Sequence, residues 1–184
     1  MTERLEPSVA YADLDSLIAR LNTMATWVSA EADGITELDH GLQCAAELAA
    51  TAPDDEALQI AGLVHDIGHG LCHIRDHDVV SAEAVRGVLG ERVAALVGLH
   101  VLAKRYLVTT DPDYRARLSP ISVASLAAQG GDLSESEVQA FEARDHWREA
   151  LMLRRADESA KVAGRDVPGL DSWLPALARV AAGV

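Results

Sequence analysis

Apolar side chains recur at helical spacing along nearly the whole chain. Leu14, Leu17, Ile18 and Leu21, for example, share one face of a predicted helix over residues 13–27. No segment alternates between apolar and polar residues over the length of a strand between hairpin turns. The pattern therefore predicts an all-α protein.

Capping residues, prolines and glycines divide this pattern into separate helices. Thr36 and Asp39 resemble a weak capping box, Pro112 and Pro120 suit a first helical turn, and Gly90 separates two helices. The predicted helices cover residues 13–27, 36–52, 54–67, 79–89, 92–106, a short segment after 112, 120–129, 134–142, 147–162 and 173–180. Repeats and long linkers are absent, so residues 1–184 are expected to form a single domain.

Composition narrows the classes of function. The net charge of −13 opposes binding to nucleic acid and to anionic membranes, so an anionic ligand needs a local basic pocket. No apolar run approaches the roughly 18 residues of a membrane helix, and the N-terminus does not resemble a secretory signal. Cys44 and Cys72 form no disulfide framework or paired metal motif. We expect a cytoplasmic protein.

Titratable residues lie on helical faces that the pattern predicts to be buried. His65 and Asp66 stand inside the apolar run 61–70. Adjacent helical residues point about 100° apart, so this pair can reach one metal ion or bridge two. His69 follows one turn later, on the same side as His65. Buried groups of this kind are costly unless they are paired or bind a metal.

Histidines and an aspartate elsewhere in the chain indicate a metal site only when they are considered together. His40 and His100 each read alone as hydrogen-bonded core residues, and Asp157 alone reads as an ion-pair partner of Arg154. Together, His40, the His65 and Asp66 pair, and Asp157 match the motif of the HD superfamily. The resemblance implies an HD-domain helical bundle with a buried dinuclear metal site.

His77 and His100 bring the set to six candidate ligands. Six protein ligands would leave a single metal ion without a free coordination position. With Asp66 as a bridge, they fit two metal ions about 3.5–4 Å apart. The identity of one ligand is not decided by spacing, because His73, one helical turn before His77, is an alternative to it. The six candidates are His40, His65, Asp66, His77, His100 and Asp157.

Two basic residues share helical faces with these candidates. Lys104 follows His100 by four residues, and Arg154 precedes Asp157 by three, which suggests an anionic substrate. Surface ion pairing is the alternative, and Lys161 pairs with its neighbour Glu158 or faces solvent.

Two serines one turn apart supply further candidate donors. Ser122 and Ser125 can donate to the same anion, although helix capping or simple packing explains them nearly as well.

Longer strings over about residues 33–162 resemble the PhnZ/TmpB-type phosphonate oxygenases, a branch of the HD superfamily similar in fold to myo-inositol oxygenase. The strings are HVLAKRYL at 100–107, DY at 113–114, LSPISVASL at 118–126, QGG at 129–131 and LRRADESAK at 153–161. The resemblance implies a mixed-valence Fe(II)/Fe(III) pair on the six candidate ligands. It also implies that O2 cleaves the carbon–phosphorus bond of a small 1-hydroxyphosphonate, releasing phosphate and a carboxylic acid.

The resemblance also assigns substrate-binding residues. It places the phosphonate on Lys104, Ser122 and Arg154, with His69 beside the substrate, so that His69 and Lys104 are the expected catalytic residues. Ser125 is added to the substrate-binding set because of its spacing from Ser122.

The chain departs from the family just before the first histidine. Ala30 and Asp33 stand where the family has a tyrosine and a glutamate, and Asp33 either faces the substrate or caps a turn with Gly34. The substituent on the substrate therefore stays open among an amino group, a trimethylammonio group, hydrogen or another polar group.

Two other classes of function remain alternatives. An HD phosphohydrolase would cleave a phosphate ester or nucleotide with metal-activated water, and an inactive domain would retain only the helices. The identity of the metal and a dependence on oxygen would distinguish a phosphohydrolase from an oxygenase. The intact set of six ligands argues against an inactive domain. The sequence leaves the oligomeric state open.

Overall fold

The computed structural model describes residues 10–29, 33–73 and 75–183. Across them it is helical, with two isolated bridges, Val28 to Thr36 and His69 to Cys72, as the only β pairing described. The all-α prediction is confirmed. The helices are α1 (Leu14–Met24), α2 (Glu37–Thr51), α3 (Glu56–Val64), α4 (His77–Thr110), α5 (Pro112–Arg117), α6 (Pro120–Ala128), α7 (Glu135–Glu142), α8 (Trp147–Ser159) and α9 (Leu170–Ala182).

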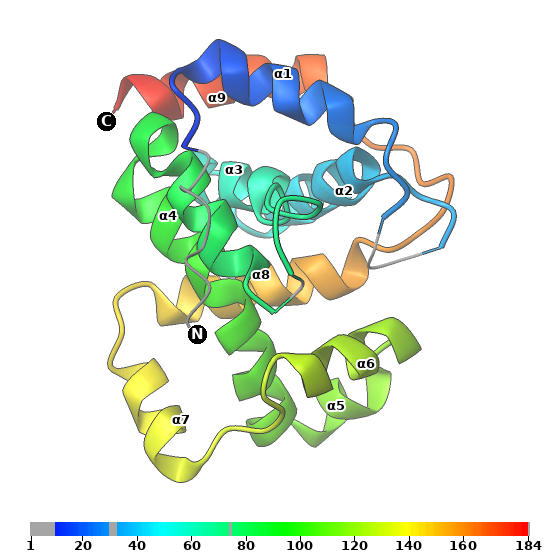
Figure 1. Ribbon diagram of the computed structural model, residues 1–184, viewed down its shortest axis with the longest axis vertical. Helices are drawn as coiled ribbons and strands as arrows, with labels where there is room; N and C mark the ends of the chain where they lie inside the picture. Colours follow the sequence, from blue (N-terminus) through cyan, green and yellow to red (C-terminus); the bar gives the residue numbers. More distant parts are fainter. Residues whose placement is uncertain (1–9, 30–32, 74, 184) are drawn as a thin grey trace, which may run out of the picture.

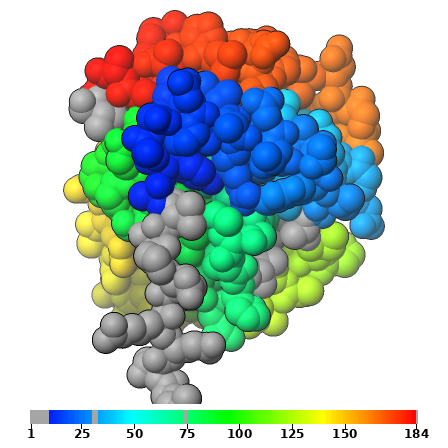
Figure 2. All heavy atoms as spheres, turned by 45° about the horizontal axis from the view of Figure 1, so that its top comes forward, coloured from blue at the N-terminus to red at the C-terminus, as the bar shows by residue number. Residues whose placement is uncertain are grey.

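Four helices form the centre of the molecule. Helix α2 packs against α3 and α8, and α4 packs against α3 and α8 (Figure 1). Helices α1 and α9 lie side by side over one face of this group, as Figure 2 shows. Their apolar faces complete the main core, in which Leu21, Ile60, Leu96 and Leu177 are fully buried. Helices α5, α6 and α7 gather at the opposite end (Figure 1).

Local sequence signals set most helix starts. The Thr36 hydroxyl accepts from the amide of Asp39 at 3.1 Å, and the Asp39 carboxylate accepts from the amide of Thr36 at 3.0 Å, which completes the predicted capping box. Ser134 caps α7 in the same way. Pro112 and Pro120 occupy the first turns of α5 and α6. Backbone N–H groups in the first turn of a helix have no acceptor within the helix, and proline has no N–H group to leave unpaired.

Helices α1, α3 and α8 each end three residues earlier than their patterns predict, α1 at Met24. In α3 and α8 the chain turns there to meet a neighbour. Helix α3 stops at Val64, and the Gly68 amide donates to the Ser81 hydroxyl of α4 at 2.8 Å. Helix α8 stops at Ser159, and Val162 exchanges backbone hydrogen bonds with the Gln43 side chain of α2 at 2.9 and 3.1 Å. Periodicity cannot report such long-range contacts.

Helix α4 consists of the two predicted helices, joined at Gly90. The Gly90 backbone has φ 81° and ψ 174°, a conformation that is essentially confined to glycine. The helix axis changes direction there, so the two halves of α4 can lie next to each other.

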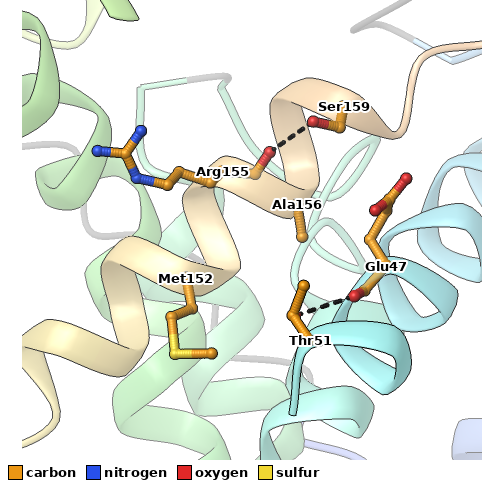
Figure 3. Close-up of a pocket in the computed structure, with 6 residues that line it drawn as sticks. All are labelled: Glu47, Thr51, Met152, Arg155, Ala156 and Ser159. Atoms are coloured by element: carbon orange, nitrogen blue, oxygen red, sulfur yellow. Dashed lines mark hydrogen bonds between the residues drawn. The ribbon is translucent and has the colours of Figure 1, made fainter.

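A surface pocket of about 220 Å³ lies between α2 and α8 (Figure 3). Its walls include Met152, Ala156 and Thr51, and its two drawn hydrogen bonds are Thr51 to the Glu47 carbonyl and Ser159 to the Arg155 carbonyl. None of the six candidate ligands is among its lining residues, so the chemistry predicted from the sequence does not belong to this pocket.

Among the described residues, no helix combines the length and apolar character that a membrane crossing would require.

We predict that Gly90→Ala lowers the free energy of unfolding by about 1–3 kcal/mol, because alanine is strained at this backbone conformation. The matched control is Gly87→Ala in the same helix, where an added Cβ meets nothing within 4 Å. That change should stabilise the protein by about 0.5–1 kcal/mol. Urea denaturation followed by circular dichroism measures both. Equal effects of the two substitutions would show that Gly90 is an ordinary helical position.

Candidate metal centre

The six candidate ligands all lie in the core between the four central helices. His40 comes from α2, His65 and Asp66 directly follow α3, and the others come from α4 and α8. All six are buried: His40, His65, Asp66, His77, His100 and Asp157.

The turn at Gly90 brings two of these histidines together. In a straight helix, the sequence separation of 23 from His77 to His100 would correspond to about 35 Å. In the structure their Nε2 atoms lie 2.9 Å apart.

One carboxylate oxygen of Asp66 faces a first group of side chains. Its Oδ2 lies 3.5 Å from His40 Nε2 and 3.3 Å from His65 Nε2. Asp157 Oδ1 approaches the same two nitrogens, at 3.2 and 3.8 Å. Four side chains from three parts of the chain thus converge on one point.

The other oxygen of Asp66 faces a second group. Its Oδ1 lies 3.3 Å from His77 Nε2 and 3.6 Å from His100 Nε2. Asp66 is therefore placed between the two groups, with one oxygen directed to each. A carboxylate that bridges two metal ions has this arrangement.

Backbone carbonyls fix the orientation of three rings. The Nδ1 atoms of His40, His65 and His100 lie 2.7, 2.8 and 2.6 Å from the carbonyl oxygens of Ala160, Gly62 and Val97. Because a carbonyl oxygen only accepts, each Nδ1 must carry a proton. In the neutral ring, Nε2 is then a free lone pair aimed into the cluster, as in histidine ligands of metals.

The contacts inside the cluster fit a metal ion better than they fit hydrogen bonds. His40 Nε2, His65 Nε2 and Asp157 Oδ1 are buried and make no hydrogen bond within the described residues. Adjacent ligands of an octahedral ion, each about 2.1 Å from it, lie about 3 Å apart, close to the separations seen here. Two overlapping groups meet the spacing that a metal needs. One is His40, His65 and Asp66, and the other is Asp66, His69 and His77.

The electrostatics of the cluster favour added positive charge. Burial lowers the pKa of His40, but Asp157 and Asp66 more than offset it and raise the pKa to about 9. The pKa of His65 is also raised well above its ordinary value, because Asp66 and Asp157 outweigh the effect of burial. The net shift is opposite for His100, where burial and the neighbouring His77 outweigh the carboxylates and lower the pKa. The two carboxylates thus favour positive charge on or between His40 and His65.

A narrow cavity joins the cluster to the two predicted cations. Its walls include Asp66, His100, Lys104, Gln129 and Arg154, and its volume of about 10 Å³ has room for about one water molecule. Lys104 and Arg154 are 1% and 2% exposed, so both are buried cations rather than surface ion-pair partners.

Each cation is held in place by hydrogen bonds. Lys104 Nζ donates to Ser125 Oγ at 2.5 Å and to Gln129 Oε1 at 3.2 Å. Arg154 Nε donates to the Tyr114 hydroxyl at 2.6 Å. The guanidinium of Arg154 also pairs with Asp157 and with Glu158.

The two serines take different partners. Ser125 accepts from Lys104 at the cavity, whereas the Ser122 hydroxyl donates to Glu158 Oε2 at 2.9 Å. Lys161 pairs with Glu158 at 3.3 Å, one of the two alternatives for this residue.

The remaining candidates divide into buried and exposed positions. His69 is buried, with Nδ1 at 3.2 Å from Glu37 Oε1 and 3.7 Å from Asp66 Oδ2. His73 is exposed, whereas its competitor His77 lies inside the cluster. Asp33 is exposed in the turn before Ile35. The departure at Ala30 lies outside the described residues.

Sequence reasoning missed three polar residues around the site: Glu37 beside His69, and Tyr114 and Glu158 beside Arg154. Two of them carried a usable signal. Glu37 precedes His40 by three residues, and Glu158 follows Arg154 by four, so each shares a helical face with a predicted site residue. The contact of Tyr114 joins α5 to α8 and leaves no trace in local spacing.

Comparison with known proteins agrees with this geometry. The model of the HD domain matches residues 39–158. The chain belongs to the HD-domain family.

Two of its curated relatives are named as phosphonate dioxygenases. The chain is 37% identical to the hydroxymethylphosphonate dioxygenase of Gimesia maris, over 77% of this chain and 75% of that protein. It is 32% identical to the [1-hydroxy-2-(trimethylamino)ethyl]phosphonate dioxygenase (glycine-betaine-forming) of Leisingera caerulea, over 79% of each. An uncharacterized protein, L432, of Acanthamoeba polyphaga mimivirus is 30% identical over 75% of this chain. The predicted resemblance to the PhnZ/TmpB-type oxygenases is confirmed.

We predict that a divalent metal stabilises the protein more as the pH rises. The folded pKa of His40, about 9, exceeds its unfolded value of 6.5. Proton binding therefore stabilises the metal-free fold fully below pH 6.5, and this contribution is lost as the pH rises through 9. A metal must displace these protons. The measurement is the Tm of thermal unfolding under anaerobic conditions, with Mn²⁺ and with a chelator, at about pH 6 and 8.5. The increase in Tm caused by Mn²⁺ should be larger at the higher pH. An increase that is equal at both values would contradict this account.

Proposed function

We propose that the protein is a di-iron oxygenase that uses O2 to cleave the carbon–phosphorus bond of a small 1-hydroxyphosphonate, releasing phosphate and a carboxylic acid. One observation carries the proposal: a single cavity is lined by Asp66, His77 and His100 and also by the buried cations Lys104 and Arg154. Metal ligands and anion-binding groups thus face the same space. The names of the relatives favour a phosphonate as the anion.

The proposed cofactor is a pair of iron ions in the Fe(II)/Fe(III) state. His40, His65 and Asp157 would hold one ion, His77 and His100 the other, with Asp66 between them. Imidazole and carboxylate ligands suit iron, and the absence of cysteine from the cluster disfavours softer metals. Bound iron would supply the one-electron chemistry that O2 requires.

The protein's own residues would bind and orient the phosphonate. Lys104 and Arg154 are buried, so their attraction for an anion is weakly screened by solvent. Ser125 and Gln129 accept hydrogen bonds from the Lys104 ammonium, and the Tyr114 hydroxyl accepts one from Arg154 Nε. Fixed cations of this kind bind the substrate and stabilise negative charge as phosphate leaves.

His69 is the proposed catalytic residue next to the substrate, together with Lys104. Glu37 Oε1 lies within hydrogen-bond distance of His69 Nδ1, so a proton held there leaves Nε2 as the group that can face the substrate. Ser122 and Ser125 are the proposed hydroxyl donors to the phosphonate. Asp33 is the proposed contact for the substituent on the substrate.

The wider assignments follow from the same proposal. Residues 1–184 would act as one HD domain in the cytoplasm, where the free thiols of Cys44 and Cys72 would remain reduced. The substrate partners would be a small anionic phosphonate and O2.

Anaerobic iron loading followed by exposure to air tests the proposal. We expect a panel of 1-hydroxyphosphonates to reveal one compound that yields inorganic phosphate in proportion to the oxygen consumed. The panel includes hydroxymethylphosphonate and the 2-amino and 2-trimethylammonio derivatives of 1-hydroxyethylphosphonate. Phosphate released from esters without oxygen, and never from phosphonates, would indicate the phosphohydrolase instead.

Lys104→Ala should lower kcat/KM for that compound by about 100-fold or more, because it removes a buried charge that the phosphonate needs. Arg179→Ala on α9 is the control, since Arg179 pairs with Glu56 at the surface and should leave kcat/KM unchanged. An active Lys104→Ala variant with unchanged KM would contradict the proposed role of Lys104.

A further inference from the structure

We propose that the Glu158 carboxylate occupies part of the phosphonate site when no substrate is bound, and that the substrate displaces it. This inference rests on the proposed function. It identifies Glu158 as a residue that determines affinity and specificity for the anion.

The contacts of Glu158 are those of a bound anion. Its Oε2 accepts from Ser122 Oγ at 2.9 Å and pairs with Lys161 Nζ at 3.3 Å and with the Arg154 guanidinium. Its Oε1 accepts from the Ser119 amide at the N-terminus of α6, at 3.1 Å. Two cations, a hydroxyl and a backbone amide thus surround one carboxylate.

Two of these groups are also predicted to bind the substrate. Ser122 and Arg154 were assigned to the phosphonate from the sequence alone, and both are buried, at 0% and 2% exposure. In the structure both are bonded to Glu158. The predicted ligand and the internal carboxylate therefore compete for the same donors.

Charge balance makes this competition strong. Arg154 and Lys161 carry two positive charges, and Asp157 and Glu158 already neutralise them. A phosphonate dianion added to this network without a rearrangement would meet two carboxylates at close range. Like charges brought together in this way repel each other and oppose binding.

Space also requires a movement. The cavity beside Arg154 has a volume of about 10 Å³, and a phosphonate group is several times larger than one water molecule. The Glu158 side chain is 14% exposed, whereas those of Arg154 and Asp157 are 3% exposed. Glu158 is thus the member of this network with the most direct route to solvent.

Displacement of Glu158 would make the site selective for strongly charged anions. A phosphonate dianion can replace a carboxylate on two cations and gain attraction, whereas a monoanion of similar shape gains little. The internal carboxylate would therefore weaken the binding of sulfonates and carboxylates more than that of phosphonates.

The test measures binding without turnover, with methylphosphonate as the probe because it lacks the reactive hydroxyl group. Isothermal titration on the purified, metal-loaded protein compares wild type with Glu158→Gln, which keeps the shape and an acceptor for the Ser119 amide but removes the charge. We expect Kd to fall by about tenfold in Glu158→Gln. Glu149→Gln, on the same helix and beside His146, is the control and should leave Kd unchanged.

Each outcome decides the inference. Weaker binding in Glu158→Gln would mean that the carboxylate positions Arg154 and Lys161 for the ligand, and unchanged binding would place the anion elsewhere. Either result overturns displacement. Thermal unfolding checks that the variant folds. If it does not, Glu158→Asp, with its shorter reach, should tighten binding by a smaller factor. Wild-type protein that binds methylphosphonate but consumes no oxygen with any 1-hydroxyphosphonate would refute the proposed function alone.

Discussion

The structure depends on one constraint, the burial of the Asp66 carboxylate among five imidazole rings. A buried charge is stable only if cations or hydrogen bonds compensate it, and each Asp66 oxygen lies within 3.7 Å of at least two histidine nitrogens. This arrangement requires α2, α3, α4 and α8 to meet at one point. It also requires the reversal at Gly90, without which His77 and His100 could not approach each other.

The same constraint explains the second layer of contacts. Carbonyl groups of Ala160, Gly62 and Val97 fix the rings of His40, His65 and His100, so the early end of α8 is part of the site. Beyond the cluster, the chain places its only two lysines near Arg154: Lys104 lines the same cavity, and Lys161 pairs with Glu158, which also pairs with Arg154. In a protein of net charge −13, these cations create a local preference for an anion.

The sequence predicted much of this, because the relevant signals are local or belong to a family motif. Helical periodicity and capping residues predicted the helices, and Gly90 was identified as a break. The motif brought out His40, His65, Asp66 and Asp157 before any geometry was known. The choice between His73 and His77 depended on burial, which spacing alone does not report.

What the sequence could not predict depends on contacts between distant segments. The ends of α3 and α8 are set by Ser81 and Gln43, which belong to other helices. The environment of Glu158 arises because the N-terminus of α6 packs near the end of α8. A spacing rule can place Arg154 and Glu158 on one face, but it cannot show that Ser122 binds the same carboxylate.

The central claim is that one chain holds two metal ions bridged by Asp66. Iron analysis combined with electron paramagnetic resonance, on anaerobically loaded wild type and Asp66→Ala, tests it most directly. We expect about two iron ions per chain and, after partial oxidation, the signal of a coupled Fe(II)/Fe(III) pair, with both lost in Asp66→Ala. A single uncoupled iron per chain in wild type, or a coupled pair that survives in Asp66→Ala, would contradict the account.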